Sequence, residues 1–258
     1  MLELSDAQIG GWVGSFLLPL FRISAMLMFM PIVGTQLVSA RVRLYLALAI
    51  CLVLVPTLPE MPEVDAISLQ AFIWVTQEIL IGVMLGFSLQ LLFQVFVIAG
   101  QIVAIQMGLG FASMVDPANG ISVPVIGQVF MILVTLLFLA MNAHLVVFEV
   151  LAESFVTLPV GGGFLVDNYW QLANRLSWVL AAALLLVLPA VTALLVVNLA
   201  FGVMTRAAPQ LNIFSIGFPL TLVLGMAIVW IGMADILAQY QVFASEALQW
   251  LRAMARAG

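Results

Sequence analysis

Six long apolar stretches limit what this chain can fold into. A helix that crosses the roughly 30 Å hydrocarbon core of a bilayer needs about 20 mostly apolar residues. The stretches that reach or approach this length cover residues 9–33, 44–58, 71–106, 123–156, 172–204 and 213–234. The sequence therefore predicts an all-α integral membrane protein with about six hydrophobic helical segments, some of them broken or extended.

The low charge content supports the same conclusion. Charged residues make up 7% of the 258-residue chain and hydrophobic residues 65%, whereas a soluble domain usually has about 25% charged residues. Most of the surface must therefore face lipid or partner proteins. The net charge is −5, and the basic residues are arginines that form no cluster, so we expect no nucleic-acid partner.

No set of residues in the sequence predicts catalysis or a cofactor. His144 is the single histidine and Cys51 the single cysteine, so there is no metal-ligand spacing. Glu149 and Glu153 share a helix face at a spacing of four residues, but they have no catalytic partners. We therefore predict that the protein is not an enzyme and binds no cofactor or metal.

The third apolar stretch is unusual in its length and its polar residues. Gln90, Gln94 and Gln101 lie on one helical face. They either form hydrogen bonds between helices of a bundle or line an aqueous path. A straight helix over 71–106 would be roughly 54 Å long at 1.5 Å per residue. That length requires strong tilt, a break near Gly86 or Gly100, or extension beyond the membrane.

The loop 108–120 that follows is rich in glycine and nearly free of charge. It contains turn-forming dipeptides, yet it also holds Phe111, Met114 and Val115, which an ordinary solvent-exposed loop would not favour. Non-helical backbone near a membrane must be covered by protein or line a cavity. The loop is therefore either a tight apolar connection or a re-entrant, plugging element inside a pore.

The C-terminal residues and the positions of the arginines give weaker signals. Residues 236–258 have apolar side chains at helical spacing, which predicts an amphipathic helix on a membrane surface or on a partner. If the segments alternate across the membrane, the arginines nearest to segment ends favour Arg41 and Arg206 on the cytoplasmic side.

Charged residues within the apolar stretches leave two functional readings. Arg22, Glu78, Glu149 and Glu153 are candidates for function because charge is costly inside a membrane, and we expect them to form structural pairs or to cap interfaces. The alternative is a stand-alone secondary transporter of a small solute or ion, with Arg22, Glu78 and Glu149 as an ion relay.

Four stretches together resemble one known family. They are residues 19–25, 41–44, 108–120 and 205–220, and the resemblance is to the FliR/SctT family of type III export-gate proteins. It implies a subunit of the flagellar protein export gate in the bacterial inner membrane, within the flagellar basal body, with parts on the periplasmic side. The implied partners are FliP-like and FliQ-like gate subunits, an FlhB-like switch subunit, unfolded proteins in transit and membrane lipid.

The same resemblance implies a division of the chain and two sets of site residues. Residues 1–170 would form FliP-like helices that include the plug loop 108–120, residues 171–235 a FliQ-like helical hairpin, and residues 236–258 the tail. The implied pore plug consists of Gly108, Gly110, Phe111, Ser113, Met114, Val115, Asp116, Pro117 and Gly120. The implied hairpin turn, which would contact the switch subunit, consists of Arg206, Pro209, Gln210 and Asn212.

Overall fold

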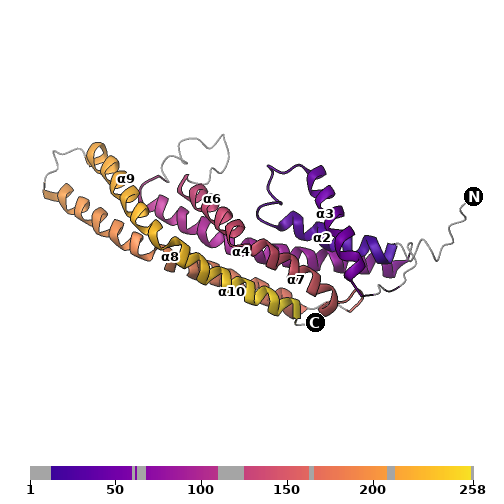
Figure 1. The fold of residues 1–258 in the computed structure, drawn as a ribbon. Coiled ribbons are helices and arrows are strands. Elements are labelled where there is room, and N and C mark those ends of the chain that lie inside the picture. Colours follow the sequence, from indigo (N-terminus) through magenta and orange to yellow (C-terminus); the bar gives the residue numbers. More distant parts are fainter. Residues whose placement is uncertain are drawn as a thin grey trace, which may run out of the picture. The chain divides into compact units, whose positions relative to one another are not determined.

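Every regular element of the described chain is helical (Figure 1). The computed structural model describes residues 13–59, 62, 68–109, 125–162, 166–207 and 213–256. Within these ranges, four helices are long and apolar enough to cross a membrane, and a bent pair of helices gives a fifth candidate span. A shorter apolar helix over Gly14–Phe29 accounts for the first predicted segment. The all-α prediction is therefore confirmed.

The regular elements follow one another along the chain, with connections of different lengths. In order they are the π-helix η1 (Val13–Leu17), α2 (Leu18–Phe29), α3 (Ala40–Leu54), the 3-10 helix η2 (Val55–Thr57), α4 (Leu69–Gln106), α6 (Val125–Ala140), α7 (Ala143–Thr157), α8 (Val166–Ala207), α9 (Ile213–Gly232), the 3-10 helix η4 (Met233–Asp235) and α10 (Ile236–Arg256).

Local sequence explains several helix ends. Pro19 lies in the first turn of α2, where its missing N–H removes no helical hydrogen bond. The Ser39 side chain accepts a hydrogen bond from the backbone N–H of Val42 and so caps the start of α3. α2 ends at Phe29, just before Met30 adopts the extended conformation that a residue preceding a proline prefers.

The third and fourth predicted segments differ from expectation in opposite ways. α4 is one continuous helix, so the break considered near Gly86 or Gly100 is absent. The stretch 123–156 was predicted as one segment, but it forms the bent pair α6 and α7. Asn142 separates them with a φ of 56°, a left-handed conformation that asparagine tolerates better than most residues.

The chain divides into two compact units. Unit 1 comprises residues 1–91, 142–175 and 245–258, and unit 2 comprises residues 92–141 and 176–244. The helices α4, α8 and α10 each contribute residues to both. The division predicted from the family resemblance, with boundaries after residues 170 and 235, stays a prediction.

Unit 1 buries one face of α2 against the first half of α4. Leu18, Ile23 and Met26 of α2 are buried, as are Met84 and Leu85 of α4. The end of α10 also belongs to this unit. Ser88 of α4 contacts the sulfur of Met254 at 3.9 Å, and the Asn168 amide donates to the Met254 carbonyl at 3.3 Å.

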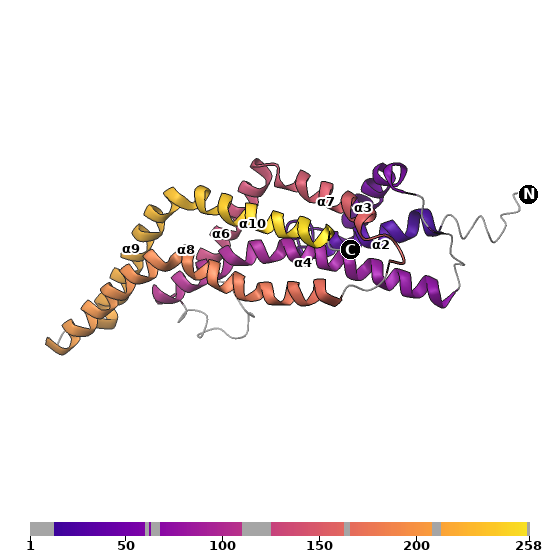
Figure 2. The same ribbon diagram turned by 90° about the horizontal axis from the view of Figure 1, so that it is seen from below.

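Unit 2 has an aromatic core between the second half of α4 and its neighbours. The ring centroids of Phe93 and Phe138 are 5.5 Å apart. Phe96 lies 6.1 Å from both Tyr240 and Phe243 of α10. In the same unit, α9 turns back along the C-terminal part of α8 (Figures 1 and 2). We call this pair the α8–α9 hairpin.

The amphipathic tail was predicted to lie on a membrane surface or on a partner. The helix is present as α10, but its apolar face is buried against this chain. Tyr240 and Phe243 lie in unit 2, and Trp250, Leu251 and Met254 lie in unit 1. The apolar face of the tail is therefore part of the core of each unit.

Candidate functional site

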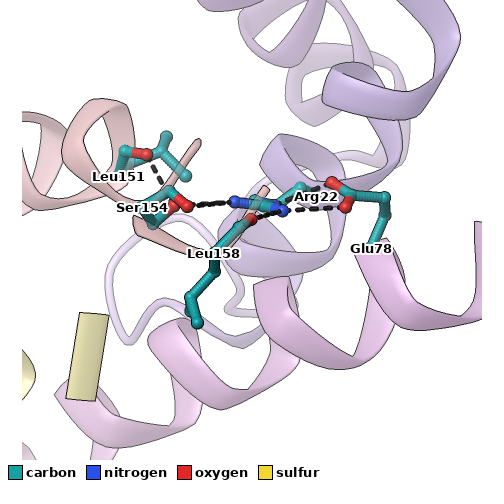
Figure 3. Close-up of polar contacts among 5 residues, drawn as sticks. All are labelled: Arg22, Glu78, Leu151, Ser154 and Leu158. Atoms are coloured by element: carbon teal, nitrogen blue, oxygen red, sulfur yellow. Dashed lines mark hydrogen bonds and ion pairs between the residues drawn. The ribbon is translucent and has the colours of Figure 1, made fainter. Parts of the chain in front are cut away.

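A buried ion pair joins α2 to α4 in unit 1. Arg22 is 0% exposed and Glu78 is 1% exposed. The Arg22 Nε–H donates to Glu78 Oε2 and its Nη2–H donates to Oε1, both at 2.7 Å (Figure 3). This parallel, two-point contact is the strongest geometry that an arginine and a carboxylate form.

The end of α7 completes the coordination of Arg22. The Arg22 Nη1 donates to the Ser154 carbonyl at 2.7 Å and to the Ser154 hydroxyl at 3.1 Å. The Arg22 Nη2 donates to the Leu158 carbonyl at 2.8 Å (Figure 3). With the two bonds to Glu78, all five N–H donors of the guanidinium have an acceptor. The group is therefore fully satisfied without water.

Two further interactions favour a cation at this place. The carbonyls of Ser154 and Leu158 belong to the C-terminal end of α7, where the helix dipole is negative. The Arg22 guanidinium also lies 4.2 Å from the ring centroid of Phe155, which adds a cation–π contact. We call Arg22, Glu78, Ser154, Phe155 and Leu158 the arginine cluster.

Two glycines of α4 allow α2 to come this close. A Cβ on Gly82 would overlap the carbonyl oxygen of Arg22, and one on Gly86 would lie 2.5 Å from the carbonyl oxygen of Met26. Gly82 and Gly86 follow Glu78 at successive spacings of four residues, so all three lie on one face of the helix. Small residues at this spacing permit close backbone approach in membrane helices.

The arginine cluster is built to hold helices together. Arg22 and Glu78 neutralise each other within a closed set of donors and acceptors, which confirms the expected structural pairing. Glu149, the third residue of the considered ion relay, instead contacts Arg252 at 3.2 Å on an exposed surface. The three relay candidates therefore belong to two separate ion pairs.

The three glutamines predicted to form a polar stripe on α4, Gln90, Gln94 and Gln101, are half-buried. Gln90 belongs to unit 1, and Gln94 and Gln101 belong to unit 2. Partial exposure is compatible with contacts between helices and with a lining of an aqueous path, so their role stays a prediction.

The described chain includes only the first residue of the predicted plug. Gly108 has a φ of +83° and ends α4. Its N–H donates to the Ile105 carbonyl at 3.0 Å, and the Leu109 N–H donates to the Ala104 carbonyl at 2.9 Å. This pattern is a Schellman cap, whose left-handed position favours glycine. The remaining predicted plug residues, Gly110, Phe111, Ser113, Met114, Val115, Asp116, Pro117 and Gly120, lie outside the described residues.

The predicted hairpin turn is described only at its start. Arg206 is exposed in the last turn of α8, where a positive charge interacts favourably with the helix dipole. The other predicted turn residues, Pro209, Gln210 and Asn212, lie outside the described residues.

Sequence reasoning identified Arg22 and Glu78 but missed the rest of the arginine cluster. The motif Gly82-x-x-x-Gly86, one helical turn after Glu78, could have predicted a close helix crossing there. No local signal marks the carbonyls of Ser154 and Leu158, because any helix end offers such acceptors. Among the described residues, no group of three or more His, Cys, Asp or Glu side chains could hold a metal ion.

Comparison with known proteins identifies similar sequences over most of the chain. The family described as bacterial export proteins, family 1, matches residues 13–247. The flagellar biosynthetic protein FliR of Escherichia coli (strain K12) is 41% identical over 229 residues, which are 88% of this chain and 87% of the relative. FliR of Bacillus subtilis (strain 168) is 30% identical over 212 residues, 80% of this chain and 81% of the relative.

Proposed function

Since the chain belongs to family 1 of the bacterial export proteins, the family of the FliR flagellar biosynthetic proteins, we propose that it helps to form and seal the pore of the flagellar protein export gate. As a FliR-family protein it is a component of the flagellar export apparatus, with multiple membrane-spanning helices, and a transport component as opposed to an enzyme. The proposal adds the pore, its seal and the substrate, which is unfolded flagellar protein in transit.

The observation that carries the proposal is the way α4 ends. The helix runs without interruption from Leu69 to Gln106 and stops at the Gly108 cap, where the predicted plug loop begins. Half-buried Gln90, Gln94 and Gln101 follow the same helix. A rigid helix with polar side chains and a capped end would hold a loop at a defined place in a channel.

The proposed seal consists of the loop residues beyond the cap. Phe111, Met114 and Val115 supply apolar side chains that exclude water and ions, and Gly110 and Gly120 allow the backbone to move aside when a substrate passes. Gly108 has a different role in this proposal, because it ends α4 in a fixed conformation. The turn that begins after Arg206 would contact an FlhB-like switch subunit on the cytoplasmic side.

The exposed apolar surface supports an assembly with other membrane proteins. Leu52 and Val53 of α3 and Val223, Trp230 and Ile231 of α9 are exposed in the isolated chain. We propose that FliP-like and FliQ-like subunits, together with lipid, cover such surfaces. The complex would lie in the bacterial inner membrane at the flagellar basal body, with parts on the periplasmic side.

Removal of the loop tests the seal. Deletion of residues 110–120 is expected to leave the subunit in its complex but to raise ion leakage across the membrane. A second variant, with a Gly-Ser linker of equal length in place of 110–120, separates the apolar side chains from the mere length of the loop. Unchanged conductance in both variants would contradict the seal.

Purification through a tag on this subunit tests the assembly. We expect FliP-like and FliQ-like proteins to be recovered in fixed ratio to the tagged chain, as measured by the mass of the intact complex. A chain that is recovered alone or as a homo-oligomer, and that transports a small ion or solute, would instead support the secondary-transporter alternative.

A further inference from the structure

A backbone carbonyl at the C-terminal end of α4 accepts a hydrogen bond from a residue of another helix. The last carbonyls of a helix have no partner within it. Here the Val103, Ala104 and Ile105 carbonyls accept from the N–H groups of Met107, Leu109 and Gly108. The Gln106 carbonyl, the last of the helix, accepts from the side-chain amide of Asn198 in α8 at 3.3 Å. All these residues belong to unit 2.

The position of Asn198 gives this bond a physical reason. Its neighbours in α8 are apolar, since the sequence around it is Leu-Val-Val-Asn-Leu-Ala-Phe. An amide in such a helix is costly unless it forms a hydrogen bond. The bond to Gln106 therefore satisfies two groups at once, one from each helix.

The second helix of the α8–α9 hairpin, α9, contacts the same end of α4. Met107 is completely buried, and its side chain fills the space where Gly225 of α9 has no Cβ. A Cβ on Gly108 would lie 3.1 Å from the ring of Phe218, also in α9. The end of α4 thus fits closely against both helices of the hairpin.

We propose that Asn198, Phe218 and Gly225 form a seat that positions the end of α4, and with it the start of the loop that follows. Asn198 is the polar positioning residue and Gly225 the steric one. The inference rests on the proposed function of that loop as a seal. It adds that the α8–α9 hairpin determines where the loop begins, so that a shift of the hairpin displaces the base of the seal.

A nitroxide label next to the cap measures the seat directly. The chain has one cysteine, so Cys51→Ala followed by Leu109→Cys places a single label at the first residue after Gly108. In the assembled complex we expect Asn198→Leu to increase the mobile fraction of this label by about threefold to tenfold, the effect of losing one hydrogen bond between membrane helices. The apolar replacement suits the surrounding helix, so insertion should not suffer.

A label at Gln239→Cys in the Cys51→Ala chain is the matched control. Gln239 is an exposed polar residue of α10 in the same unit and does not belong to the seat, so its mobility should not change in Asn198→Leu. Equal mobilisation of both labels would show a general loosening of the unit and would overturn the seat. No change at position 109 would also overturn it.

Gly225 offers an independent test with its own rescue. A Cβ at this position overlaps the Met107 side chain, so Gly225→Ala should mobilise the label at 109. Met107→Ala in the same chain removes the overlapping atoms and should restore an immobile label. If Gly225→Ala leaves the label immobile, the steric part of the seat is wrong.

The two proposals can fail separately. If Asn198→Leu increases both the mobility of the label at position 109 and the ion leakage, the result supports the seat and the seal. If mobility rises but neither this variant nor deletion of 110–120 increases leakage, the seat stands and the seal is wrong. If mobility is unchanged while the deletion leaks, the seal stands and the seat is wrong.

Discussion

Arg22 and Glu78 form a two-point ion pair across 56 residues of sequence, with both nitrogen–oxygen distances at 2.7 Å. The pair joins α2 to α4, and the Ser154 hydroxyl and the Ser154 and Leu158 carbonyls at the end of α7 accept the other three guanidinium protons. Three helices thus depend on one side chain. Because both charges are fully buried, each is stable there only while the other is present.

Replacement of one partner alone should therefore destabilise the fold strongly. In Glu78→Gln the guanidinium keeps its charge but loses its counter-charge within the core. We expect the free energy of unfolding to fall by about 3–5 kcal/mol, measured by denaturant unfolding of the purified chain in detergent.

A double variant separates the charge from the packing. Arg22→Met combined with Glu78→Leu removes both charges and fills the space with apolar groups. The double variant should therefore lose less stability than the sum of the losses in Arg22→Met alone and Glu78→Leu alone. Additive losses would show that the two residues act independently, contrary to the geometry.

The exposed pair between Glu149 and Arg252 should behave differently. The Arg252 and Glu149 side chains are 40% and 67% exposed, with a single contact at 3.2 Å. Solvent and salt screen such pairs, so Glu149→Gln should change the free energy of unfolding by less than about 1 kcal/mol. The same chemical change at Glu78 is the natural comparison, and equal effects at the two sites would refute the assigned difference in burial.

The glycine face of α4 gives a steric prediction. Gly82→Ala and Gly86→Ala each place a Cβ against the backbone of α2, so the helices must separate, at a cost of about 1–3 kcal/mol. Gly202→Ala and Gly232→Ala are matched controls, because a Cβ at these positions has no neighbour within 4 Å. Thermal unfolding should show lower midpoints only for the first two variants.

The hydrophobic segments could be predicted because their signal is local. Length and apolar composition alone define a membrane-spanning helix, and the prediction of 71–106 agrees with α4 at Leu69–Gln106 within two residues. The division between α6 and α7 could not be predicted in this way. Neither Gly nor Pro marks Asn142, and its left-handed backbone depends on how the flanking helices pack.

The partners of Arg22 could not be predicted because several acids were available. Glu78, Glu149 and Glu153 were all candidates within apolar stretches, and helical spacing does not relate residues on different helices. In the structure Arg22 pairs with Glu78, because Gly82 on the same face of α4 has no side chain and lets α2 approach closely. The α4–Asn198 contact was missed for the same reason, since it joins positions 92 residues apart.

Cys51 provides a last prediction about the N-terminal helices. The thiol is 0% exposed in α3, and its sulfur lies 3.6 Å from the Phe16 carbonyl oxygen. A buried thiol reacts only when its helix opens. In detergent we expect N-ethylmaleimide to modify it at least about 100-fold more slowly than in denaturant, which corresponds to an opening free energy of roughly 2.7 kcal/mol or more. Tyr45→Cys in a Cys51→Ala chain is the control, because Tyr45 is exposed on the same helix and should react without protection. Equal rates at the two positions would show that α3 is not packed against the N-terminal segment.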